Sequence, residues 1–228
     1  MRLIFVRHAE SLANLEGRYQ GRGDYDLSDT GRRQADRLSR RFILEQLSPT
    51  QVYSSPLRRA VETAEIVCRN WAVAIEPWHD LIEYDVGAFT GLTWPDIVSR
   101  HPQMAEAFHK TRDWDSVAHV ELVSQRHDRA ARVIETIIDR HSDQDVVLCF
   151  SHGGILQHVI SALLGADRTW GIPVRNTAVF DFSLDRQIWS AQGKNRFNTK
   201  HCSILAFNDA SHLASAVTMV AESESSKE

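Results

Sequence analysis

Short apolar runs alternate with longer amphipathic stretches along most of the chain. The apolar runs have the length and composition of buried strands, and we expect strands at residues 3–6, 51–54, 73–75 and 145–150. The amphipathic stretches carry apolar side chains at helical spacing, and we expect helices at residues 28–47, 56–67, 128–140 and 153–164. Two or three short strands are expected later, around residues 179–184, 187–190 and 203–207. This alternation predicts an α/β fold, a three-layer α/β/α sandwich with a mostly parallel central sheet.

The stretch from residue 81 to residue 127 interrupts the alternation. It combines scattered glycines and prolines with several aromatic residues, so we expect loops and short helices that lie over an opening. Residues 84–127 would then be a covering insertion. No internal repeat or linker divides the chain, which predicts one domain over residues 1–210. The polar residues 211–228 are expected to form a flexible C-terminal tail.

Composition and charge narrow the classes of partner. The net charge of −4 gives no reason to expect nucleic acid. No apolar run approaches the roughly 18 residues that a bilayer-spanning helix needs, so no membrane partner is expected. The first residues carry charge too early for a secretory signal. Cys68, Cys149 and Cys202 are too far apart to suggest a disulfide framework, which is typical of a reducing compartment. We expect a cytoplasmic protein and leave a homo-oligomer open.

Two of the predicted strands each lead into a histidine that is followed by a small residue. The first strand leads into Arg7-His8-Ala9, and the strand at 145–150 leads into His152-Gly153. Ligands of such sheets bind in the crevice at the carboxyl ends of the strands, so neighbouring strands would bring the two imidazoles face to face. A histidine that only caps its strand is the ordinary explanation for either one alone. The matched pair favours a shared site.

Arginines gather at the same predicted end of the sheet. Arg58 and Arg59 stand in the first turn of a helix, where positive charge opposes the helix dipole. An anion between the helix and an arginine would remove that conflict. Arg32 and Arg33 begin another helix in the same way, so solvated surface arginines stay an alternative. Arginine binds phosphate through forked hydrogen bonds, and two arginines with two histidines suit a phosphoryl group.

Metal and dinucleotide sites are the rival explanations. The sequence contains no HExxH, HxH or HxxxH spacing, and His152 and His158 lie six residues apart, off a common helix face. The Gly153-Gly154 turn follows a strand, but the GxGxxG pattern of a dinucleotide loop is missing. We therefore expect no metal and no cofactor.

Five blocks follow one another in a specific order. The first is RHAES at residues 7–11, with Asn14 six residues beyond His8; the others read YQGRGDYDLSDTGRRQA, SSPLRRAVETA, LIEYDVGAFTGL and FSHGG. This series resembles the histidine phosphatase superfamily, also called phosphoglycerate mutase-like. The resemblance runs from residue 1 to about residue 180, where Asn176 begins a late strand. Two positions depart from it: Ala9 replaces the usual glycine, and Val120-Glu121-Leu122 stands where many members have Gly-Glu-Ser.

The resemblance implies a mechanism and a role for each matching residue. His8 would attack phosphorus in line and form a phosphohistidine, which water would hydrolyse. The implied catalytic residues are His8, Glu83 as proton donor, and His152. The implied phosphate-binding residues are Arg7, Asn14, Arg59 and Gly153. Substrate-binding residues are expected at Gln20, Gly21 and Arg22.

A phosphatase is favoured over a mutase. Mutases of this family usually follow the acid with Arg-His-Tyr-Gly, whereas Tyr84-Asp85-Val86-Gly87 stands here, and the long basic, proline-rich insert of those mutases is missing. The expected substrate is a small phosphorylated metabolite. Phosphoglycerate mutase-type transfer and a non-catalytic phosphate-binding regulator are the alternatives. The predicted covering segment offers side chains that could contact many phosphate esters, namely Trp94, Phe108, His109, Lys110, Arg112 and Trp114. Arg18 and Arg22 could bind a second anionic group of the substrate.

Overall fold

A single six-stranded sheet forms the centre of the computed structural model, which describes residues 1–166, 168–169, 171–190 and 201–214. The strand order is β3-β2-β4-β1-β5-β6. The strands are β1 (Arg2–Arg7), β2 (Gln51–Ser54), β3 (Ile75–Pro77), β4 (Val146–Ser151), β5 (Val179–Leu184) and β6 (Cys202–Asp209). Strands β1 to β4 pair in parallel, whereas β5 runs antiparallel to both of its neighbours. The predicted mostly parallel sheet is confirmed.

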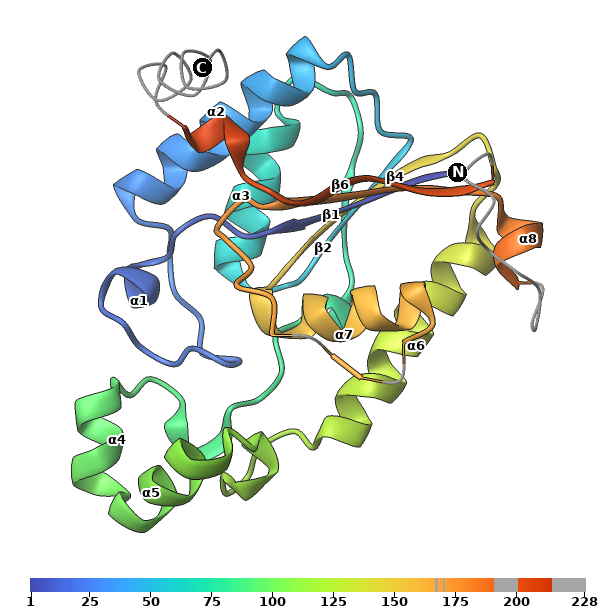
Figure 1. The fold of residues 1–228 in the computed structure, drawn as a ribbon. Coiled ribbons are helices and arrows are strands. Elements are labelled where there is room, and N and C mark those ends of the chain that lie inside the picture. The colour runs from blue at the N-terminus through green and yellow to red at the C-terminus, as the bar shows by residue number, and fades with distance from the viewer. Residues whose placement is uncertain (167, 170, 191–200, 215–228) are drawn as a thin grey trace, which may run out of the picture.

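Helices cover both faces of this sheet (Figure 1). Helices α2 (Asp29–Leu44) and α3 (Arg58–Cys68) pack on one face, and α6 (Val123–Arg140) and α7 (Gly153–Leu164) pack on the other. Strand β1 shows why the layers form: Leu3 and Phe5 face the α6–α7 layer, whereas Ile4 and Val6 face the α2–α3 layer. A strand buried on both sides needs such a continuous apolar run.

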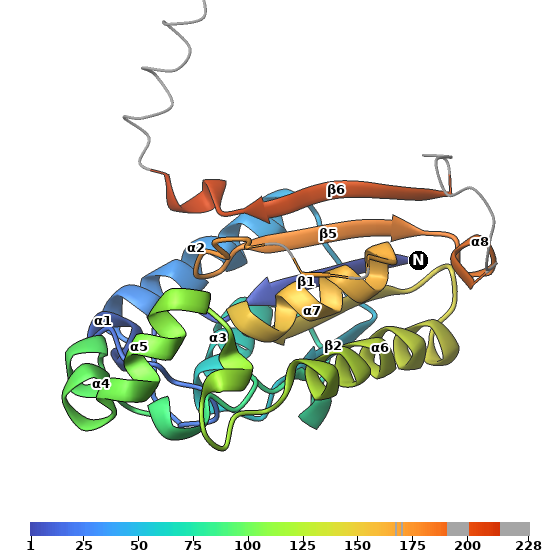
Figure 2. The same cartoon turned by 60° about the horizontal axis from the view of Figure 1, so that its bottom comes forward.

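Short elements complete the described chain. They are the helices α1 (Leu12–Leu15), α4 (Trp94–Arg100), α5 (Pro102–Thr111) and α8 (Arg186–Ser190), and the 3₁₀ helices η1 (His79–Leu81), η2 (Gly87–Phe89), η3 (Trp114–Ser116) and η4 (Ser211–Leu213). Helices α4 and α5 lie at the end of the molecule toward which β1 points (Figure 2). Together with η2 they form a small apolar core, which includes Phe89, Ile97 and Phe108. Within the described residues, no helix is long and apolar enough to cross a membrane.

Several predicted bounds were wrong. The strand expected at 187–190 is helix α8, because Asp185 caps it: its carboxylate accepts from the N–H of Ile188 at 3.1 Å, and its carbonyl accepts from that of Trp189. The strand expected at 73–75 begins at Ile75, and the helix expected from 128 begins at Val123. The C-terminal tail predicted from residue 211 stays a prediction, because residues 211–213 form η4 and residues 215–228 lie outside the described residues.

Candidate active site

A cavity of about 310 Å³ opens beyond the carboxyl ends of β1 and β4. Residue Arg7 pairs with Ser151 across these strands, so His8 and His152 each follow the same register position. The cavity brings together most of the residues predicted from the sequence, namely Arg7, His8, Asn14, Gln20, Gly21, Arg59, Glu83 and Gly153. His152 and Arg22 are not among its lining residues.

The imidazole of His8 is held in one tautomer. Its Nδ1 lies 2.6 Å from the carbonyl oxygen of Ala9, so Nδ1 carries the hydrogen and donates it. The lone pair is therefore on Nε2. Burial, together with the positive charges of Arg59 and Arg7, lowers the pKa of His8 well below 6.5. His8 is consequently a neutral imidazole with one free lone pair, the state that a nucleophile requires.

This pKa shift predicts how activity depends on pH. Because the pKa is lowered in the folded protein, His8 stays neutral as the pH falls through 6.5 and is protonated only in more acidic solution. The acid limb of kcat/KM that belongs to His8 should therefore lie below pH 6.5. Removing the charge of Arg59 should move that limb to higher pH. The profile must be corrected for the substrate phosphate, which itself titrates near pH ~6; a His8 limb at or above 6.5 would contradict the assignment.

Arg59 is fully buried and is fixed by three of its own hydrogen bonds. Nε donates to Nδ1 of His152 at 3.1 Å, and the terminal nitrogens donate to the carbonyls of Gly23 at 2.7 Å and Gly21 at 2.9 Å. A guanidinium has five N–H donors, so one remains on each terminal nitrogen. Burial lowers the pKa of Arg59 to about 10, which still leaves it charged at neutral pH. Arg59 thus lines the cavity as an oriented cation.

Arg7 supplies a second cation with an unused donor. One terminal nitrogen donates to the carbonyl of Val174 at 2.5 Å, whereas the buried Nε has no hydrogen-bond partner in the described structure. The side chain lies over the first turn of α7, where a Cβ at Gly153 would come within 3.3 Å of Arg7 Nε. A buried N–H without an acceptor is costly, and an anion in the cavity would remove that cost.

Asn14 is oriented so that its amide nitrogen stays available. Its Oδ1 accepts from the backbone N–H of Ser11 at 3.2 Å and from Nδ2 of Asn176 at 3.4 Å. The same Nδ2 of Asn176 donates to the carbonyl of His8 at 3.1 Å. Asn176 therefore fixes both the backbone of His8 and the side chain of Asn14. Sequence reasoning had assigned Asn176 no such role, because only the fold places it beside residues more than 160 positions earlier.

Glu83 lies at the N-terminus of α7. Its two carboxylate oxygens accept from the N–H groups of Gly154 at 2.9 Å and Ile155 at 2.8 Å. These N–H groups of the first helical turn have no partner within the helix, and they hold the carboxyl group of Glu83 in one direction. Gly154 is required there, since a Cβ would collide with the ring of Tyr84 and the carboxylate of Glu83. The catalytic acid predicted from the sequence is thus a fixed wall of the cavity.

His152 lies beneath the cavity and supports it. Its ring centroid is 5.1 Å from that of His8, Nδ1 accepts from Arg59, and Nε2 lies 2.7 Å from Oγ of Ser55. Burial and the charge of Arg59 lower the pKa of His152 well below its usual value. Both ring nitrogens are occupied, so His152 orients Arg59 together with the carbonyls of Gly21 and Gly23. Its predicted catalytic role stays a prediction.

The outer wall of the cavity was only partly foreseen. Of the covering-segment side chains expected at the substrate, Trp114 lines the cavity, whereas Trp94 and Phe108 pack with one another. The other lining residues are Arg18, Tyr19, Tyr84, Val86, Gly154, Gln157, Ile172 and Val174. Arg22, expected beside Gln20 and Gly21, instead contacts Glu121 at 3.1 Å and lines a different cavity. No sequence motif predicts which aromatic residues line the cavity.

The neighbouring arginines of α3 provide an internal comparison. Arg58 is largely exposed and pairs with Asp26 at 2.7 Å, away from the cavity that Arg59 lines. A hydrogen bond to a charged group contributes about 1.5–3 kcal/mol, and more when charge develops in the transition state. We expect Arg59→Ala to lower kcat/KM at least ~10-fold and Arg58→Ala to be near neutral. Steady-state kinetics with one aryl phosphate tests both, and the reverse order would contradict the assignment.

A neutral imidazole beside two oriented arginines is an arrangement suited to phosphoryl transfer through a histidine. The model of the histidine phosphatase superfamily (branch 1) matches residues 3–196, and the chain belongs to this family. It is a phosphatase that acts through a phosphohistidine on small phosphorylated metabolites.

Comparisons with individual proteins agree with this. Phosphoglycerate mutase-like protein 4 of Arabidopsis thaliana is 32% identical over 195 residues, which cover 83% of each chain. The metal-independent phosphoserine phosphatase of the same plant is 31% identical over 69% of this chain and 66% of its own. Among solved structures, Bacillus stearothermophilus YhfR has a TM-score of 0.77 at 26% identity and covers 93% of this chain and 99% of its own.

Proposed function

We propose that the enzyme transfers a phosphoryl group from a small ester to Nε2 of His8 and then to water. The observation that supports this most directly is the fixed tautomer of a neutral His8 beside two arginines with unused donors. Arg7, Asn14, Arg59 and the first turn of α7 at Gly153 bind the phosphoryl oxygens. Such preorganised donors stabilise the charge of the transition state.

Glu83 handles the proton in both steps. As Nε2 forms its bond to phosphorus and the bond to the ester oxygen breaks, protonated Glu83 gives its proton to that oxygen and an alcohol leaves. Glu83, now a carboxylate, takes a proton from water. The resulting hydroxyl oxygen attacks phosphorus, the phosphorus–nitrogen bond breaks, and inorganic phosphate leaves. His8 is again neutral and Glu83 again protonated.

The remaining walls favour an ester whose leaving group is uncharged and carries a ring. Tyr19, Tyr84 and Trp114 line the cavity, and among the described residues Arg18 is its one cation besides Arg7 and Arg59. Arg18 already pairs with Glu16 at 2.5 Å and donates to the carbonyl of Gly91 at 2.8 Å. A carboxylate on the substrate would thus be desolvated with little compensation, whereas a ring would gain by burial against aromatic side chains.

A panel of phosphate esters tests this proposal. Esters of uncharged, ring-bearing alcohols should have a kcat/KM about tenfold or more above that of phosphoserine and phosphoglycerate. A preference for the two carboxylate esters would contradict the proposed substrate class. Conversion of one phosphoglycerate isomer into the other would instead support the mutase alternative, and phosphate binding without turnover would support a regulatory protein.

We further propose a cytoplasmic enzyme without a nucleic-acid partner. Cys68, Cys149 and Cys202 are free thiols, as expected in a reducing compartment. The net charge of −4 favours no polyanion.

Activity is expected to need no metal ion. Among the residues that the structure describes, no three His, Cys, Asp or Glu side chains are grouped so that they could hold one. The two arginines supply the positive charge that a metal would otherwise provide. Exhaustive treatment with a chelator should leave kcat/KM unchanged, and activity that is lost on chelation and restored by one divalent ion would contradict this prediction.

A further inference from the structure

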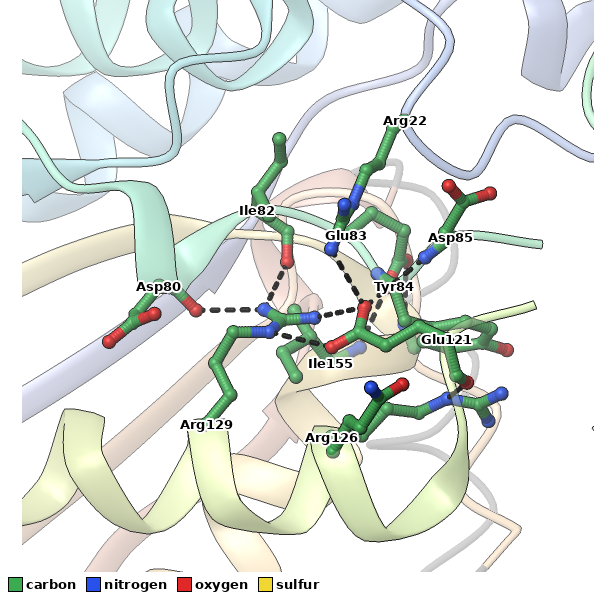
Figure 3. A network of polar contacts seen from close by, with 12 residues as sticks. Arg22, Asp80, Ile82, Glu83, Tyr84, Asp85, Glu121, Arg126, Arg129 and Ile155 are labelled. Atoms are coloured by element: carbon green, nitrogen blue, oxygen red, sulfur yellow. Dashed lines mark hydrogen bonds and ion pairs between the residues drawn. The ribbon is translucent and has the colours of Figure 1, made fainter. Parts of the chain in front are cut away.

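A buried ion pair lies behind the loop that carries Glu83. Arg129 on α6 donates to both carboxylate oxygens of Glu121, at 2.9 and 2.8 Å (Figure 3). The two side chains are only 6% and 9% exposed. Neither residue lines the cavity that contains His8. A forked pair of this kind fixes direction as well as distance.

This pair holds the backbone on both sides of Glu83. The guanidinium of Arg129 also donates to the carbonyls of Asp80 at 2.9 Å and Ile82 at 2.7 Å, just before Glu83. On the other side, Asp85 exchanges hydrogen bonds with Glu121: its N–H reaches the carboxylate at 3.3 Å, and its carbonyl accepts from the N–H of Glu121 at 3.0 Å. One ion pair therefore anchors the peptides before and after the proton donor.

Tyr84, the residue that follows Glu83, is also held by helix α6. The guanidinium carbon of Arg126 lies 4.1 Å from the ring centre of Tyr84, and its Nε donates to the carbonyl of Glu121 at 2.6 Å. Tyr84 in turn lines the cavity. Helix α6 thereby holds the backbone of Glu121 in addition to its side chain.

A further contact joins Glu121 to the loop on the phosphate-binding side of the cavity. Arg22 donates to Oε2 of Glu121 at 3.1 Å. Arg22 stands between Gly21 and Gly23, whose carbonyls hold the guanidinium of Arg59. The loop that orients Arg59 and the loop that presents Glu83 thus meet at one carboxylate (Figure 3).

We propose that Glu121 is a positioning residue, which sets Glu83 against the leaving-group oxygen and couples it to the loop that orients Arg59. This rests on the proposed role of Glu83 as proton donor. Removing one partner of a buried pair leaves the other charged and unpaired, so the loop around Glu83 would shift. A displacement of about 1 Å at a reacting group can cost as much as ~100-fold in rate.

The variant Glu121→Gln tests the proposal through the leaving group. The phosphorylation burst should fall about tenfold or more for an alkyl phosphate, whose leaving group needs a proton, and less than about threefold for nitrophenyl phosphate. A role confined to folding would lower the active fraction or the melting temperature and slow both bursts equally. Equal slowing of the two bursts would overturn the proposal.

A double-variant cycle distinguishes failure of the positioning role of Glu121 from failure of the proposed proton-donor role of Glu83. In a Glu83→Gln background, Glu121→Gln should no longer change the ratio of the two bursts, because it acts through Glu83. An undiminished effect would overturn the positioning role. If Glu83→Gln alone leaves the ratio unchanged, the proton-donor role itself is wrong.

Two substitutions on the same network complete the test. Arg132→Ala is the matched control: Arg132 also lies on α6 and contacts Asp80 at 3.1 Å, but through an exposed side-chain pair. Arg132→Ala should leave both bursts unchanged; a loss like that of Glu121→Gln would overturn the proposal.

Arg22→Ala should raise the Ki of inorganic phosphate at least about threefold and leave the ratio of the two bursts unchanged. An unchanged Ki would overturn the proposed coupling between Glu121 and the loop that orients Arg59. If Glu121→Gln does not fold, Arg129→Lys takes its place with the same expected burst ratio.

Discussion

Replacing His8 by alanine is expected to abolish turnover. Hydrolysis of phosphate monoesters is among the slowest uncatalysed reactions, and His8 carries the lone pair fixed for attack. In the wild-type enzyme, a phosphoryl group that is acid-labile and stable to base should be trapped on His8 during turnover. The measurement is a quenched reaction with a radiolabelled ester, followed by localisation of the label.

The control for this substitution is His141→Ala. His141 follows α6 just before β4 and contacts the hydroxyl of Tyr53 at 3.1 Å, outside the cavity. It should retain both turnover and the trapped phosphate. His8→Ala should still bind inorganic phosphate, because Arg7 and Arg59 remain. Normal turnover by His8→Ala would contradict the proposed mechanism as a whole.

Glu83→Gln is expected to separate substrates by their leaving groups. An alkoxide needs a proton as the P–O bond breaks, whereas a nitrophenolate hardly does. General acid catalysis typically contributes 10²- to 10⁴-fold. The phosphorylation step should therefore slow by about that factor for an alkyl phosphate and far less for nitrophenyl phosphate. Glutamine keeps the size of the side chain and an oxygen for the N–H groups of Gly154 or Ile155.

Single-turnover burst kinetics is the appropriate measurement for this variant. In the proposed mechanism Glu83 also activates water in the second step, so a slow dephosphorylation would conceal the difference in steady-state rates. Equal loss for both substrates would rule out Glu83 as the acid. Asp85 would then be the next candidate, although its carboxylate accepts from the N–H of Gly87 at 2.8 Å and lines the other cavity.

The central layers of the fold could be predicted because their signals are local. Strand β1 reads as one apolar run since both of its faces are buried, and α2 has its N-cap at Ser28, which accepts from the N–H of Gly31 at 2.9 Å. The prediction of a strand at 187–190 was wrong because four residues are too few to show a clear strand or helix periodicity. The cap that Asp185 provides favours helix α8 there.

The sequence by itself determined the α/β class and the two strands that lead into His8 and His152, because strand burial and strand ends are properties of neighbouring residues. The order in which the five sequence blocks follow one another identified the family. Only the tertiary structure decided that Asn176 fixes Asn14, that aromatic residues of the covering segment form the outer wall, and that Glu121 meets both Arg22 and Arg129. These contacts join residues as many as 162 positions apart in the sequence. They depend on the side-chain directions that packing imposes, which no local pattern encodes.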